Sequence, residues 1–316
     1  MRKAPRMKWV LVLPAFVLAA MLPLVASGYR QRPQPDQKSV RIQLLSLLDD
    51  REPLYMLTGG GGNSLVLVRD EGVVLIDSKL PGWSQALLDK VALVTDRPVT
   101  MIINTHAHVD HTGGNRELPT VTDIIAHERT RATMRKMDEF KGPNAKFLPN
   151  KTVIERMSLF EEQVRIDLYY FGAGHTDGDL VAVLPEHGIA YMGDLFPSKA
   201  TPVIDQPNGG SGVAFPETLA RAVREISRVT RVVTGHDPGP APGMPRRPLG
   251  DIQSWSDLQE YVDFNRDFLD AVRTAFKQGK RADEAAANLP LPGKYATYDM
   301  QQARANVEII YKELSK

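Results

Sequence analysis

The feature that most constrains this chain is a cluster of potential metal ligands directly after a predicted strand. Three histidines and one aspartate lie within six residues, in the order His106, His108, Asp110 and His111. The apolar, β-branched run at 99–103 predicts the strand, and two glycines soon after the cluster predict a turn. Side chains two residues apart point the same way in an extended backbone, so the first two histidines can face one point. Three of the chain's seven histidines are here, which favours a metal site over a loop of unrelated surface histidines.

Length and composition narrow the function classes. The 316 residues are enough for one domain of about 250 residues with additions, or for two domains. The charged and apolar fractions are ordinary for a globular protein, and the chain has no basic run, so we expect a small-molecule substrate and no nucleic acid. The chain has no cysteine. Disulfides are therefore excluded, and every protein ligand to a metal must be His, Asp or Glu.

The N-terminus has the pattern of an export signal. Four cations precede an apolar run at 9–26, and small residues follow it. This pattern predicts a signal peptide over 1–27 and a periplasmic or secreted mature protein. The alternative is a retained membrane anchor that faces the periplasm, because 18 apolar residues are close to the length of a span. Residues 28–50, with two prolines, are predicted to be a linker, and membrane contact is expected only through an uncleaved N-terminus.

Apolar runs separated by turn residues predict an α/β protein. Strands are expected at 54–57, 64–68, 73–76, 99–103, 124–126, 152–154, 158–160, 164–170, 180–184, 189–192 and 231–233. Helices are expected at 83–93, at 128–140, after Pro216, and in two long C-terminal segments, from Ile252 to Phe276 and from Val307 to Leu314.

Two further features lie near predicted strand ends. The four-glycine run Gly59–Gly62 predicts a mobile loop that approaches a ligand closely. Asp77 follows the strand at 73–76. It is predicted either to cap the next helix or to support a metal ligand from behind, and the sequence leaves these roles open. His127 and His187 lie in a helix start and a turn, and we expect both to be structural or exposed.

Three more potential ligands occur next to glycine after an apolar run. They are His175 in Gly-His-Thr, Asp194 in Gly-Asp and His236 in Gly-His. Glycine lets the backbone turn sharply, which brings the neighbouring side chain over the strand ends. One Gly-His pair is weak evidence, but three such sites after the His-x-His-x-Asp-His cluster strongly indicate one metal centre.

The order of these motifs resembles that of the metallo-β-lactamase superfamily over residues 54–240. The resemblance implies a four-layer αββα sandwich at 51–245, with C-terminal helices at 246–316 that pack on the same domain. It also implies a dinuclear metal centre at one edge of the sandwich. The implied ligands are His106, His108 and His175 for the first ion, Asp110, His111 and His236 for the second, and Asp194 as a bridge.

The chain departs from the true lactamases of this family at Asp194, where they have cysteine or serine. A bridging aspartate is similar to glyoxalase II and to many lactone, ester and phosphodiester hydrolases. The resemblance therefore implies a hydrolase with two Zn²⁺ ions that cleaves an ester, thioester, lactone or amide bond, a β-lactam included. Lys199, five residues further on, is predicted either to anchor a substrate carboxylate or to be a solvated lysine.

A two-zinc site predicts a metal-bound hydroxide as the nucleophile. Asp110 is the predicted catalytic residue, because its carboxylate can orient the water and move a proton. The alternative is a mononuclear iron persulfide dioxygenase, because two histidines and one carboxylate suit non-haem iron and the sulfur dioxygenases of the same superfamily use positions of the His106, His175 and Asp194 type. A flavin enzyme and a non-catalytic metal-binding module are less favoured. Metal content and oxygen uptake on a persulfide discriminate between the hydrolase and the dioxygenase.

Overall fold

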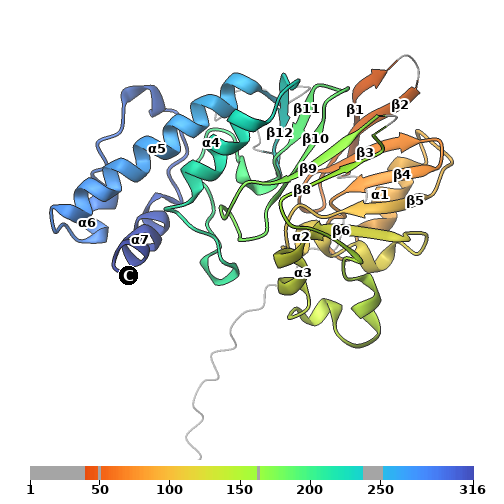
Figure 1. Ribbon diagram of the computed structural model, residues 1–316, viewed down its shortest axis with the longest axis horizontal. Coiled ribbons are helices and arrows are strands. Elements are labelled where there is room, and N and C mark those ends of the chain that lie inside the picture. The colour runs from red at the N-terminus through yellow and green to blue at the C-terminus, as the bar shows by residue number, and fades with distance from the viewer. Residues whose placement is uncertain (1–39, 49–50, 162–163, 238–251) are drawn as a thin grey trace, which may run out of the picture. The chain divides into compact units, whose positions relative to one another are not determined.

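The computed structural model describes residues 40–316 apart from 49–50, 162–163 and 238–251 (Figure 1). The chain divides into residues 1–34 and 35–316, and the description below concerns the second unit. The predicted signal peptide at 1–27 lies outside the described residues. Among those that are described, no helix is long and apolar enough to cross a membrane.

Two sheets form the centre of the fold (Figure 1). The first contains, in spatial order, β1 (Arg41–Leu48), β2 (Arg51–Thr58), β3 (Ser64–Arg69), β4 (Gly72–Ile76), β5 (Val99–Ile103), β6 (Asp123–His127) and β7 (Lys151–Val153). The second contains β13 (Ile252–Ser254), β12 (Arg231–Val233), β11 (Ile189–Tyr191), β10 (Leu180–Leu184), β9 (Ile166–Tyr170) and β8 (Arg156–Leu159). The pairs β4–β5 and β11–β12 are parallel.

The alternation of apolar side chains along each strand explains why both faces of each sheet are covered. In β4, Val74 and Ile76 pack between the two sheets, whereas Val73 and Leu75 pack outward. The outward face contacts α1 (Ser84–Val91). Because successive side chains of a strand point to opposite faces, an apolar run of this kind is buried on both sides.

Helices cover the outer face of the second sheet in the same way. Apolar side chains of α4 (Phe215–Glu225), α5 (Trp255–Lys277) and α7 (Ala303–Leu314) share a core with Val181 and Ala190 of this sheet. The C-terminal helices therefore pack on the sheet that carries the second half of the motifs. The layers run helix, sheet, sheet, helix, which confirms the predicted αββα sandwich with extra C-terminal helices.

Three expectations about single elements were wrong. Strand β1 lies within the predicted linker 28–50, because its leucine-rich sequence pairs with β2 and buries Leu45. The helix predicted at 128–140 ends early: α3 covers Glu128–Met134, and a separate 3₁₀ turn then brings Phe140 into contact with Met134.

The third concerns the C-terminus, which has three helices instead of two, with α6 at Ala282–Ala287. The first of them also begins later than Ile252, which belongs to β13. The reason is a capping box: the Ser254 hydroxyl accepts from the Asp257 amide, and the Asp257 carboxylate accepts from the Ser254 amide. This cap starts α5 at Trp255.

Candidate metal centre

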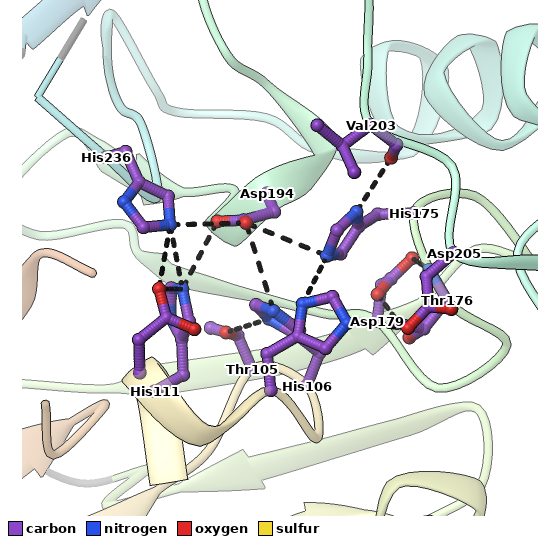
Figure 2. A network of polar contacts seen from close by, with 12 residues as sticks. Thr105, His106, His111, His175, Thr176, Asp179, Asp194, Val203, Asp205 and His236 are labelled. Carbon is purple, nitrogen blue, oxygen red and sulfur yellow. Dashed lines mark hydrogen bonds and ion pairs between the residues drawn. The ribbon is translucent and has the colours of Figure 1, made fainter. Parts of the chain in front are cut away.

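The seven predicted ligands come together where the strands end. In each sheet, a parallel pair of strands delivers residues to the same edge: β4 and β5 in the first sheet, β11 and β12 in the second. The ligands form two groups, in each of which the potential ligand atoms lie within 4.8 Å of one another. The first ligand group is His106, His108, His175 and Asp194, and the second ligand group is Asp110, His111 and His236. Figure 2 shows the two groups side by side.

Each imidazole of the first ligand group uses one nitrogen for a protein contact and leaves the other facing the group. His106 Nδ1 lies 3.0 Å from Thr105 Oγ1. His108 Nε2 lies 2.6 Å from an Asp205 carboxylate oxygen, and His175 Nδ1 lies 2.7 Å from the Val203 carbonyl oxygen. Histidines that bind metals are held from behind in this manner.

The remaining nitrogens of this group point toward one another. His175 Nε2 lies 2.9 Å from His108 Nδ1. Within the described residues, His106 Nε2 is buried without a hydrogen-bond partner. Burial also lowers the pKa of His106 well below its ordinary value, so this ring is neutral, the form that binds a metal. The residues present thus fit a divalent ion at the first ligand group.

The second ligand group has its own support from Asp77. This fully buried carboxylate lies 2.8 Å from His111 Nδ1 and accepts hydrogen bonds from the Thr105 amide and the Tyr191 hydroxyl. Its backbone is left-handed, with φ of +64°, a strained conformation that is typical of functional sites. The cap position of α1 is Trp83, so the contacts support the alternative in which Asp77 stands behind a ligand.

The Asp194 carboxylate lies between the two groups (Figure 2). One oxygen lies 3.6 Å from His175 Nε2 and 3.3 Å from His236 Nε2, and the other lies 3.4 Å from His111 Nε2. Burial raises the pKa of Asp194, but the neighbouring His111, His236 and His106 together outweigh it, so the net pKa is well below the ordinary value. This side chain is therefore an ionised carboxylate that lies within reach of both groups, as a bridging ligand requires.

Neighbouring carboxylates raise the pKa values of the histidines in the second ligand group. Burial lowers the pKa of His111 and of His236, but Asp194 raises both, and the net pKa of each lies above its ordinary value. Carboxylates that favour a proton on these rings also favour a divalent cation beside them. The Asp110 side chain is only partly buried, and one oxygen lies 3.3 Å from His236 Nε2. With His236, which is more exposed, it forms the side of the centre that a water or substrate can reach.

Gly59–Gly62 approaches the centre, but as a packed segment of the protein. A Cβ on Gly60 would lie 2.4 Å from the Trp83 ring, and one on Gly62 would lie 2.3 Å from the His111 ring. The Gly62 amide also donates to the Asp110 carbonyl at 3.2 Å. The predicted close approach is therefore present, but it is to the ligand His111, and the described contacts do not support the mobile loop expected from the sequence.

The remaining predicted residues lie outside the two groups. Lys199 pairs with Glu260 of α5 at 3.5 Å, so nothing in the described contacts supports its predicted role as a substrate anchor. His127 accepts a hydrogen bond from the Arg129 amide at the start of α3 and stacks on Tyr170, which is the structural role expected for it. His187 is buried in the turn between β10 and β11.

The residues that hold the first ligand group from behind were not predicted from the sequence. Asp205 contacts a histidine 97 positions earlier, and Val203 contributes only its carbonyl oxygen. Neither contact has a local motif that would reveal it. A conformational signal exists in the neighbouring Gln-Pro-Asn-Gly turn, where Gly209 adopts φ of +79°, but a turn by itself does not identify a ligand's partner.

Comparisons with known proteins agree with this centre. The sequence profile described as "Metallo-beta-lactamase superfamily" matches residues 57–256. The metallo-beta-lactamase type 2 of Bacillus cereus is 26% identical over 179 residues, which cover 55% of this chain and 66% of that protein. The hydroxyacylglutathione hydrolase of Maricaulis maris is 25% identical over 187 residues, which cover 56% of this chain and 58% of that protein. The chain thus spans less than two thirds of the length of these relatives.

A solved structure shows that the likeness extends to the fold. The sec-alkylsulfatase Pisa1 from a Pseudomonas species superposes with a TM-score of 0.64 at 16% identity, covering 82% of this chain and 48% of that one. The profile and the relatives confirm the predicted family, and the solved structure confirms the predicted fold. Since the profile covers more than half of its 316 residues, the chain belongs to the metallo-β-lactamase superfamily.

Proposed function

We propose that this protein is a dinuclear zinc hydrolase that cleaves an ester, thioester or lactone. The observation that carries the proposal is the position of Asp194, one oxygen of which lies near His175 and His236 and the other near His111. Seven ligands are too many for one tetrahedral zinc. Two ions bound at these groups would supply a hydroxide at neutral pH and polarise the bond to be cleaved.

The protein's own residues then have separate tasks. Asp110, partly exposed beside His236, would accept a proton from the attacking water and orient it. Asp77 would keep the proton of His111 on Nδ1 and leave Nε2 for the ion. Asp194 would hold the two ions together, because one of its oxygens lies near His175 of the first ligand group and the other near His111 of the second.

Charge supports esters and thioesters over β-lactams. Asp194 adds a carboxylate to the centre, which would repel the carboxylate of a lactam antibiotic. Lys199, for which a substrate anchor was one of two predicted roles, pairs with Glu260. The hydroxyacylglutathione hydrolase of Maricaulis maris is 25% identical to this chain, about as similar as the metallo-beta-lactamase of Bacillus cereus at 26%. We therefore expect weak or no lactamase activity.

A panel of substrates tests this choice. Zinc-loaded protein should hydrolyse some acyl thioesters or lactones. It should hydrolyse nitrocefin and a carbapenem, which represent the β-lactams, weakly or not at all. The His106→Ala variant, which lacks a ligand, should lose all hydrolysis and so excludes a contaminating esterase. A kcat/KM for a lactam of about 10⁵ M⁻¹s⁻¹ or more, with no turnover of the other substrates, would contradict the proposal.

The second candidate is a mononuclear iron dioxygenase that oxidises a persulfide. It is favoured by the first ligand group, in which His106, His175 and Asp194 supply two histidines and a carboxylate beside the third histidine, His108. The equally assembled second ligand group argues for two ions instead. Oxygen uptake on a persulfide by iron-loaded protein, with no hydrolysis by the zinc form, would select the dioxygenase.

A further inference from the structure

The residues 201–213, here called the support segment, lie behind two histidines of the first ligand group. The Val203 carbonyl accepts from His175 at 2.7 Å, and the Asp205 carboxylate lies 2.6 Å from His108. The Asp205 amide also donates to the His175 carbonyl at 2.8 Å. Figure 2 shows Val203 on the far side of the His175 ring from Asp194. The support segment therefore sets the orientation of two metal ligands.

The support segment is itself held by the C-terminal part of the chain. At its start, the Thr201 amide donates to the Asp299 carbonyl at 2.8 Å. The buried Asn306 side chain of α7 donates to the Pro202 carbonyl at 2.9 Å. These contacts come directly before the two residues that touch the histidines.

At the other end of the support segment, one side chain of α7 satisfies three donors. The Glu313 carboxylate accepts from the Ser211 hydroxyl at 2.7 Å, the Gly212 amide at 3.0 Å and the Val213 amide at 3.1 Å. Ile310 of the same helix packs against Gly212 so closely that a Cβ there would lie 2.6 Å from it. Hydrogen bonds to a carboxylate are stronger than those between neutral groups. Helix α7 therefore holds the support segment at both ends, through Asn306 at one and Glu313 at the other.

We propose that α7 is a positioning element of the metal centre, acting through Asn306, Glu313 and the support segment on His108 and His175. The inference rests on the metal binding proposed above. The helix lies beyond the part of the chain that matches the family profile, residues 57–256. It therefore supplies support that the matched part of the chain does not contain. Loss of a group that orients a ligand typically weakens metal binding by 10- to 100-fold.

Glu313→Gln tests the proposal. Glutamine has an NH₂ group in place of one carboxylate oxygen, and this group cannot accept the hydrogen bonds that the oxygen accepts in the wild type. The zinc affinity of the full-length protein is measured by competition with a chromophoric chelator. One of the two ions should bind about tenfold more weakly, while the other changes by less than about threefold. Glu308→Gln is the matched control, since Glu308 is on the same helix and pairs with the exposed Arg304. It should leave both affinities unchanged.

A double variant separates positioning from general stability. Asp205→Ala should weaken the same ion, and Asp205→Ala with Glu313→Gln should weaken it by less than the sum of the two single losses, because both changes act partly through the Asp205–His108 contact. If Glu313→Gln does not fold, Glu313→Asp keeps the charge with a shorter reach and should show a smaller loss at the same ion. Unchanged affinities, or fully additive losses, would overturn the inference. Wild-type protein that fails to bind two ions would instead refute the proposed function.

Discussion

Four imidazoles of the centre are each held from behind by a different residue. A threonine hydroxyl supports His106, a carboxylate supports His108, a backbone carbonyl supports His175 and Asp77 supports His111. A carboxylate behind a ligand raises its basicity more than a carbonyl or a hydroxyl does. The four rings are therefore not electrostatically equivalent.

The ligands themselves could be predicted from single residues, because each follows an apolar run and lies beside glycine or in the His-x-His-x-Asp-His cluster. Glycine at 235 is required physically: a Cβ there would lie 2.0 Å from Asp194 Oδ1. The partners behind the ligands could not be predicted, since Asp205 and Val203 reach their histidines only through the tertiary fold.

At the residue scale, Asp110→Asn tests the proton transfer. Asparagine has nearly the same shape but cannot take up a proton, so kcat should fall by about 10²- to 10⁴-fold while KM changes little. Steady-state kinetics on the best substrate, with metal content measured in parallel, gives the result. Asp89→Asn, an exposed position on α1, is the control. Near-native turnover in Asp110→Asn with both metals bound would rule out this role for Asp110.

At the element scale, strands were easier to predict than helices. Most strands are short apolar runs with turn residues on both sides, and the sheets bury them on two faces. Strand β1 was missed because a strand at the edge of a sheet depends on pairing with β2, which a proline-rich neighbourhood obscures. Helix α3 ended early because Phe140 packs on Met134 from a separate turn.

The turn between β10 and β11 predicts a pH effect on stability. His187 is buried there, and within the described residues neither ring nitrogen has a hydrogen-bond partner. Burial lowers its pKa to about 4. In the unfolded chain, His187 has an ordinary pKa and takes up a proton near pH 6.5. In the folded protein, it takes up this proton only near pH 4. The free energy of unfolding should therefore fall as the pH is lowered through this window, by about 1–2 kcal/mol at pH 5.

Urea unfolding at pH 7.5, 6 and 5 measures this effect, with a chelator present so that metal release does not contribute. His187→Leu removes the titrating group and should lose less stability than the wild type between pH 7.5 and pH 5. Equal losses in the two proteins would show that His187 does not titrate in this way.

At the scale of the whole molecule, the metal centre depends on parts of the chain that the sequence motifs predict and on contacts that they do not predict. The sandwich and its ligands were predictable because the order of the motifs over residues 54–240 resembles that of the metallo-β-lactamase superfamily. The C-terminal helices were predicted to pack on the same domain, and they share a core with the second sheet. Their contact with the support segment was not predictable, because Glu313 reaches Ser211 across 102 positions.

The N-terminal residues give a prediction about location. The cations before the apolar run at 9–26 and the small residues after it favour cleavage near residue 27 and release into the periplasm. Expression with the native N-terminus, cell fractionation and intact-mass measurement should find a soluble periplasmic form that lacks residues 1–27. A membrane-bound form that still begins at Met1 would favour the anchor instead.

The metal content of the purified protein tests the dinuclear zinc centre most directly. Elemental analysis of protein purified without added metal or chelator should give about two zinc ions per chain, because the two ligand groups share Asp194 and are assembled together. The His236→Ala variant, which disrupts only the second ligand group, should retain about one. One iron per chain with no zinc, unchanged in His236→Ala, would contradict the dinuclear centre and favour the mononuclear dioxygenase.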